Sequence, residues 1–120
     1  MIAVIFEAET TPDTQGEYLD LASQLRPLLN DIEGFISIER FQSLTVPNKV
    51  LSLSFWRDED AVQRWRNLTM HRNVQTAGRD HVFSNYRLRV ASVLRDYGMS
   101  ERQQAPDDSR KIHEKVEKNV

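Results

Sequence analysis

The sequence has no cysteine among its 120 residues, so disulfide bonds, thiolate metal sites and cysteine nucleophiles are excluded. It has only four glycines, and they form neither a GxGxxG fingerprint nor a phosphate-binding P-loop. No apolar run approaches the roughly 20 residues that a bilayer-spanning helix needs. The first residues, MIAVIFEAETTP, lack a basic segment, so we expect no signal peptide.

An excess of positive charge is also missing, since 16 Lys and Arg face 18 Asp and Glu and the net charge is -2. The composition therefore gives no basic field for nucleic acid and indicates no membrane partner. Its 39% hydrophobic and 28% charged residues are ordinary for a globular protein. We expect a cytoplasmic protein with one main domain.

The first half of the chain predicts a strand, a helix and a hairpin. The segment IAVIFEAE is short, β-branched and aromatic, as strands are. Thr14 and Glu17 have the spacing of a capping box at the start of a helix. Pro27 predicts a kink or an end of this helix near Arg26, and Gly34 closes the segment. FISIERFQSL and KVLSLSFW then alternate with period two around the turn cluster TVPN.

The second half predicts one more helix and strand. Asp58 is placed as an N-cap, and the helix continues through RNVQTAG to Gly78. NYRLRVASVLRDYG is the last strand. The apolar stripe of the helix consists of Ala61, Val62, Trp65 and Leu68.

This order predicts an α+β fold, the ferredoxin-like βαββαβ arrangement, with both helices on one face of an antiparallel sheet. We expect the domain to span residues 1–98, followed by a polar tail over 99–120. In the tail, Ile112, Val116 and Val120 recur every four residues, so it is either solvated or a short amphipathic helix.

The sheet face away from the helices is predicted to be too apolar to meet water, which favours a homodimer formed sheet to sheet. We assign the following residues to that face: Ile5, Val50, Ser52, Ser54, Trp56, Arg89 and Val93.

Motifs for hydrolysis or metal binding are absent. No Ser-His-Asp arrangement has a nucleophile elbow. His71, Asp80, His81 and His113 lack the compact spacing of metal ligands, so we expect no metal site. The acidic run at 58–60 is explained by the dipole of the helix that it begins.

One region combines an imidazole with aromatic residues. If the second helix breaks near Thr69, His71 can turn toward the space between helix and sheet, among Phe6, Phe55 and Phe83. An imidazole there is a usable general acid or base near neutral pH. The alternative is that Trp65 is plain core and His71 ends the helix.

The segment FWRDEDAVQRWRNLTMHRNVQTAGRD, followed by YRLRV, resembles the antibiotic biosynthesis monooxygenase (ABM) domain family over about residues 1–97. The resemblance implies a dimeric α/β barrel with a pocket between helices and sheet in each subunit. Some relatives oxygenate aromatic polyketides with O₂ and without metal or flavin, and others degrade haem.

The haem-degrading relatives use three residues: an Asn near the end of the first strand, a Trp on the second helix, and a later His that is the ligand of the haem iron. Here the first strand ends FEAE, Trp65 matches the helical Trp, and the ligand position holds Gln75 or a neighbour. Two of the three haem features are therefore missing.

The leading hypothesis is a cofactor-independent monooxygenase that acts on a small aromatic or quinol-like molecule, with O₂ as co-substrate. Such an enzyme needs an apolar slot, a base and donors to an oxyanion. Trp65 and Phe55 supply the slot, His71 the base, and Arg72 or Asn67 the donors. The alternatives are a non-catalytic dimeric ligand-binding module and a haem-binding protein.

Overall fold

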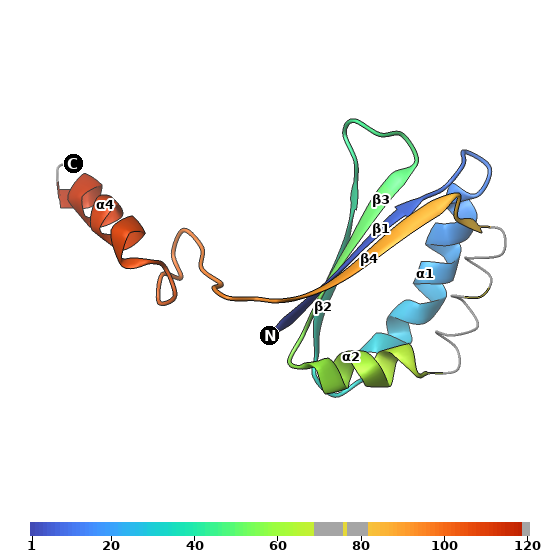
Figure 1. Cartoon of the computed structure of the whole chain (residues 1–120), viewed down its shortest axis with the longest axis horizontal. Coiled ribbons are helices and arrows are strands. Elements are labelled where there is room, and N and C mark those ends of the chain that lie inside the picture. The colour runs from blue at the N-terminus through green and yellow to red at the C-terminus, as the bar shows by residue number, and fades with distance from the viewer. Residues whose placement is uncertain (69–75, 77–81, 119–120) are drawn as a thin grey trace.

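The computed structural model describes residues 1–68, 76 and 82–118 (Figure 1). The continuation of the second helix that we predicted through RNVQTAG lies, except for residue 76, outside the described residues. The elements are β1 (Ile2–Glu9), α1 (Gln15–Leu29), β2 (Phe35–Gln42), β3 (Lys49–Trp56), α2 (Glu59–Arg66), β4 (Asn85–Ser92) and α4 (Asp107–Lys118).

The four strands form one antiparallel sheet in the order β2-β3-β1-β4. In this sheet the central strand β1 pairs with both β3 and β4, so Phe6 lies between Ser52 and Leu88. Both α1 and α2 lie on the same side of the sheet (Figure 1). The predicted ferredoxin-like arrangement is confirmed.

We call the sheet face toward the helices the inner face and the opposite one the outer face. Along β3 every second residue is buried, and these residues are Val50, Ser52, Ser54 and Trp56. Our assignment of these four to the outer face was wrong. Alternation shows which side chains share a face but not which of the two faces the helices cover. The outer face instead carries Ile5 of β1, which pairs with Leu53, and the two other apolar residues of β3 in phase with Leu53, which are Leu51 and Phe55.

A bulge in β2 changes the alternation near its start. The pairing steps from Phe35↔Trp56 to Ser37↔Phe55, which leaves Ile36 without a partner and 52% exposed. Phe35 thereby packs edge-on against Trp56, with ring centroids 5.2 Å apart. The extra residue brings Phe35 to the inner face, which a strict period of two does not predict.

Helix α1 begins where we expected but differs in two details. Thr14 occupies the N-cap position, yet its side chain makes no cap hydrogen bond and instead accepts one from the Thr11 N–H at 2.9 Å. Pro27 does not end the helix at Arg26, because α1 continues to Leu29. Burial of Leu29, only 2% exposed, stabilises the last turn and offsets the hydrogen bond that proline cannot donate.

The start of α2 is fixed by a cap and a close contact. The predicted N-cap is confirmed, since the Asp58 carboxylate accepts a hydrogen bond from the Ala61 N–H at 2.9 Å. Gly34 has a φ of 91°, and a Cβ on it would lie 2.7 Å from the Ala61 side chain. Only glycine therefore lets β2 begin this close to α2.

The chain beyond β4 leads to α4, which lies away from the sheet and both other helices (Figure 1). Local contacts hold this segment: the Asp96 N–H donates to Gln104 Oε1 at 2.9 Å, and the Arg102 guanidinium stacks on Tyr97. Of the two options for the tail, the structure therefore has the helix, over Asp107–Lys118. Within the described part of the chain, no helix has the length and apolar character to cross a bilayer.

Candidate functional site

Among the described residues, the buried core forms two clusters rather than one. The first contains Ala8, Tyr18, Val50 and Val82, and the second contains Leu29, Trp56, Ala61 and Val62. A cavity of about 180 Å³ is lined by residues of both. An apolar cavity of roughly 150 Å³ is known to admit benzene, so this one has room for a ring with a short chain.

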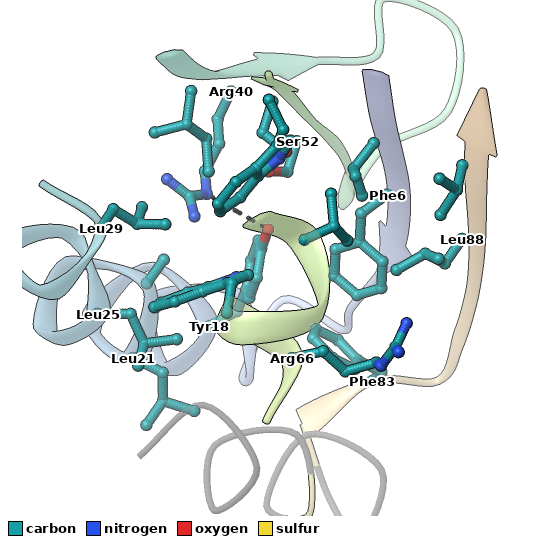
Figure 2. A pocket seen from close by; sticks show the side chains of 18 residues that line it. Phe6, Tyr18, Leu21, Leu25, Leu29, Arg40, Ser52, Arg66, Phe83 and Leu88 are labelled. Carbon is teal, nitrogen blue, oxygen red and sulfur yellow. Dashed lines mark hydrogen bonds between the residues drawn. The ribbon is translucent and has the colours of Figure 1, made fainter. Parts of the chain in front are cut away.

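The cavity lies between the sheet and the helices. Helix α1 lines it with one face, the inner face of the sheet lines the opposite wall, and α2 contributes Trp65 and Arg66. Figure 2 shows Leu21, Leu25 and Leu29 of α1 on one side and Phe6 and Leu88 of the sheet on the other. Most of the wall is apolar, as in typical small-molecule sites.

Aromatic rings line both ends of the cavity. At one end Phe83 packs edge-on against Phe6 and Tyr18, with centroids 5.5 and 5.3 Å away. At the other end Trp56 and Trp65 are tilted by 31° with centroids 6.4 Å apart. Such contacts order the rings beyond simple burial, so the cavity walls are stiff.

The middle of the inner face is polar. Two buried serines, Ser52 and Ser54, are too small to fill the space under α1, and this leaves the core open. Ser54 Oγ accepts a hydrogen bond from Trp56 Nε1 at 2.9 Å, which fixes the indole. Arg40 Nε donates to Tyr18 Oη at 3.4 Å, a long contact that Figure 2 draws across the cavity.

Among the described residues, Asp58 at the cap of α2 has a perturbed carboxylate, and it does not line the cavity. The Ala61 N–H donates to the Asp58 carboxylate, and the Arg57 guanidinium lies 3.0 Å from it. Both groups lower the pKa of Asp58 below its usual value, and the hydrogen bond from the Ala61 N–H has the larger effect. The pair holds the helix that carries Trp65, and it takes no part in lining the cavity.

The structure brings together three of the predicted site residues and separates others. Phe6, Trp65 and Phe83 all line the cavity. Phe55 lies on the outer face and does not, because it alternates with Trp56. Asn67 is the C-cap of α2, where its N–H bonds to the carbonyls of Gln63 and Trp65.

His71 and Arg72 lie outside the described residues, so their roles stay predictions. Among the residues that the structure does describe, no cluster of three His, Asp or Glu is placed to hold a metal ion.

Sequence reasoning missed five polar residues of the cavity: Tyr18, Arg40, Ser52, Ser54 and Arg66. Arg40 could have been found from the sequence, because it lies two residues after Ile38 on β2 and so shares the face of that apolar residue. A charged side chain on a buried face needs a group of opposite charge or a hydrogen-bond partner.

The model of the family described as antibiotic biosynthesis monooxygenase matches residues 1–77. A jasmonate monooxygenase of Pyricularia oryzae is 48% identical over 93 residues, 78% of this chain and 43% of that protein. The chain thus spans less than half the length of this relative. The protein YqjZ of Bacillus subtilis is 30% identical over 93 residues, 78% of this chain and 79% of its own length.

Among solved structures, a mutant of SnoaB, a cofactor-independent oxygenase from Streptomyces nogalater, superposes with a TM-score of 0.69. The match covers 79% of this chain and 94% of SnoaB at 13% identity, so it supports the fold alone.

Proposed function

Because this chain belongs to the antibiotic biosynthesis monooxygenase family, we propose that it is a monooxygenase acting on a small, mostly apolar molecule in the cavity. The observation that carries the proposal is the aromatic cavity between helices and sheet, with Trp65 in its wall. Its volume of about 180 Å³ suits one ring with a short chain, such as a quinol.

The proposed reaction needs no cofactor, because the substrate supplies all the electrons. A base removes a proton from a carbon made acidic by a neighbouring carbonyl or hydroxy-aromatic ring. The resulting carbanion passes an electron to O₂, and the two radicals combine into a peroxide anion at that carbon. The protonated base returns its proton to this peroxide anion, which becomes a hydroperoxide. The base then removes the second proton from the same carbon, the O–O bond breaks, and the outer oxygen leaves as hydroxide. The product has a C=O group, and the hydroxide takes the second proton to form water.

The cavity contributes to each part of this reaction. Its apolar walls exclude water from the carbanion and the peroxide. Donors at its polar middle stabilise the negative oxygen of the ionised substrate. We propose His71 as the base, with Arg72 as a further donor, as the sequence suggested. Asn67, the other predicted donor, is exposed at the C-cap of α2 and does not line the cavity.

We also propose that the protein works as a homodimer through the outer face. Four side chains that are only half-buried, Ile5, Leu51, Leu53 and Phe55, form its apolar centre. Ion pairs of Glu7 with Lys49 at 3.6 Å and with Arg89 at 3.2 Å border it. An apolar centre with a charged rim is typical of subunit interfaces.

The reaction is tested by oxygen uptake with hydroquinones and anthrone, followed by mass spectrometry of the product made under ¹⁸O₂. We expect one labelled oxygen in the product and the other in water. Because the relative from Pyricularia oryzae is named for jasmonate, jasmonate is a further probe. Product oxygen that comes from water, or no uptake with any probe, contradicts a monooxygenase and leaves the non-catalytic binding module.

The base is tested with His71→Gln. The substitution keeps volume and hydrogen bonding, so the fold should persist while turnover falls by about 10²- to 10⁴-fold. Wild-type turnover should rise with pH through the imidazole's titration, since only the neutral ring accepts a proton. Full activity in His71→Gln removes His71 from this role.

A further inference from the structure

Arg40 is a charged side chain in an apolar setting. It lies half-buried on the inner face of β2, and its partner across the sheet is Ser52. Its guanidinium points into the cavity toward Tyr18 (Figure 2). Charges in such places are normally paired, because desolvation is costly.

No carboxylate pairs with Arg40 in the part of the chain that the structure describes. Two other arginines show the contrast: Arg57 lies 3.0 Å from Asp58, and Arg89 lies 3.2 Å from Glu7. From the described residues, the Arg40 side chain receives just the long contact with the Tyr18 hydroxyl. A guanidinium carries five N–H donors, so most of its capacity is unused.

Two hydroxyls beside Arg40 also have protons to give. Because Tyr18 Oη accepts from Arg40 Nε, its own proton stays available for another acceptor. Ser52 is 7% exposed and lines the cavity, and its hydroxyl has no hydrogen-bond partner among the described residues. Ser54 also keeps its own proton, because its Oγ only accepts from Trp56 Nε1, but its partner across the sheet is Ile38 and not Arg40. One position in the cavity thus gathers a cation and two free O–H groups.

We propose that this position binds the carboxylate of an apolar acid, which defines the substrate class of the proposed monooxygenase and rests on that function. The acid forms a charge-assisted pair with the Arg40 guanidinium and accepts hydrogen bonds from Tyr18 and Ser52. Its hydrocarbon part lies against the aromatic ends of the cavity. A planar carboxylate matches the two parallel N–H groups of a guanidinium, which a neutral carbonyl does not.

The second guanidinium at the cavity, that of Arg66, is a weaker candidate. Arg66 is exposed, and it comes from α2, whereas Arg40 comes from β2 on the sheet side of the cavity. An exposed cation is already hydrated and gains little from a carboxylate. The experiment must therefore distinguish binding of the carboxylate by Arg40 from binding by Arg66.

Binding is measured by tryptophan fluorescence, because both tryptophans of the chain, Trp56 and Trp65, line the cavity. The probes are phenylacetate and phenylacetamide, which share a shape and differ in charge. We expect the wild type to bind the acid more tightly. Arg40→Met should weaken phenylacetate about 30-fold or more, the usual loss when a desolvated charge pair loses one partner, and leave phenylacetamide nearly unchanged.

Three further variants complete the set. Tyr18→Phe should weaken the acid about tenfold, since it removes one hydrogen bond to a charged group. Arg26→Met removes a positive charge from the exposed side of α1 and should change nothing. Arg66→Met, at the edge of the same cavity, should weaken phenylacetate much less than Arg40→Met does. Retained binding of phenylacetamide shows that the Arg40→Met cavity is folded.

The proposal is overturned if acid and amide bind the wild type equally, or if Arg66→Met rather than Arg40→Met loses the acid. These measurements need neither O₂ nor turnover. A protein that binds the acid through Arg40 but consumes no oxygen therefore contradicts the monooxygenase and not the acid site.

Discussion

The two faces of the sheet differ in a way that inverts the usual pattern. The inner face along β3 carries two serines among its four buried residues, whereas the outer face carries Leu51, Leu53 and Phe55, all half-buried. The more apolar face is thus the less covered one. Small polar residues inside leave room for a ligand, and large apolar residues outside need a cover. One strand therefore contributes to two different sites.

The largest effect that tests this comparison is expected from Trp56→Ala. Trp56 is 1% exposed, and its truncation should lower the free energy of unfolding by about 3–5 kcal/mol, as for other buried aromatic residues. Phe55→Ala is the matched control, because the neighbouring ring lies on the outer face. Chemical denaturation at a concentration where the protein is monomeric should show a clearly smaller loss for Phe55→Ala. Equal losses would mean that the two faces are covered equally.

The outer face is tested by Leu53→Asp, which places a carboxylate at its apolar centre. If two outer faces meet, the dimer should weaken about 30-fold or more, the scale of a central interface residue, because the charge is buried without a partner. Sedimentation should show single chains at concentrations where the wild type is paired. Leu19→Asp adds the same charge to an exposed position on α1 and should leave the dimer intact.

A wild type that sediments as a monomer at micromolar concentration contradicts the proposed assembly directly. So does a Leu53→Asp variant that pairs as tightly as the wild type. The cavity would be unaffected by either result, since its lining comes from the inner face and the helices.

The fold could be predicted from the sequence because each element has a strong local pattern. The alternating hairpin strands, the Asp58 cap and the strand over 2–9 all depend on neighbouring residues. The exceptions depend on tertiary structure. Pro27 remains inside α1 because Leu29 is buried, and the bulge at Ile36 depends on its pairing with β3. No local signal distinguished the two faces of β3.

The candidate site was predictable only in its aromatic part. Phe6, Trp65 and Phe83 were placed together because bulky rings in one small fold gather in its core. The sequence could not show that Trp56 lines the cavity and Phe55 does not, because this depends on which face of the sheet the helices cover. Arg40, Tyr18 and Ser52 come from three elements, so only the sheet register and the position of α1 reveal that they meet.

The smallest expected effect concerns Asp58, the N-cap of α2, which is the helix that follows β3 and lies on the inner face. Asp58→Ala removes the acceptor of the Ala61 N–H and the partner of Arg57, so the melting temperature at neutral pH should fall by a few degrees. The variant should also weaken ligand binding in the cavity slightly, through Trp65 on α2, and leave the dimer unchanged. Asp60→Ala is the control, because it removes a carboxylate from the same first turn without removing the cap.

The pH dependence of this difference follows from the lowered pKa of Asp58. The hydrogen bond from Ala61, and then Arg57, favour the ionised carboxylate in the folded state, so the unfolded chain takes up the proton first as the pH falls. The stabilisation is therefore complete above the unfolded pKa of about 3.9 and is lost as the pH falls through the lower folded value. Melting curves of wild type and Asp58→Ala should keep a constant separation from pH 7 to about 5 and converge below about 4. A difference in melting temperature that persists unchanged into strong acid would show that the cap stabilises α2 without its negative charge. The ion pair with Arg57 would then add nothing to the stability of the helix that covers the inner face.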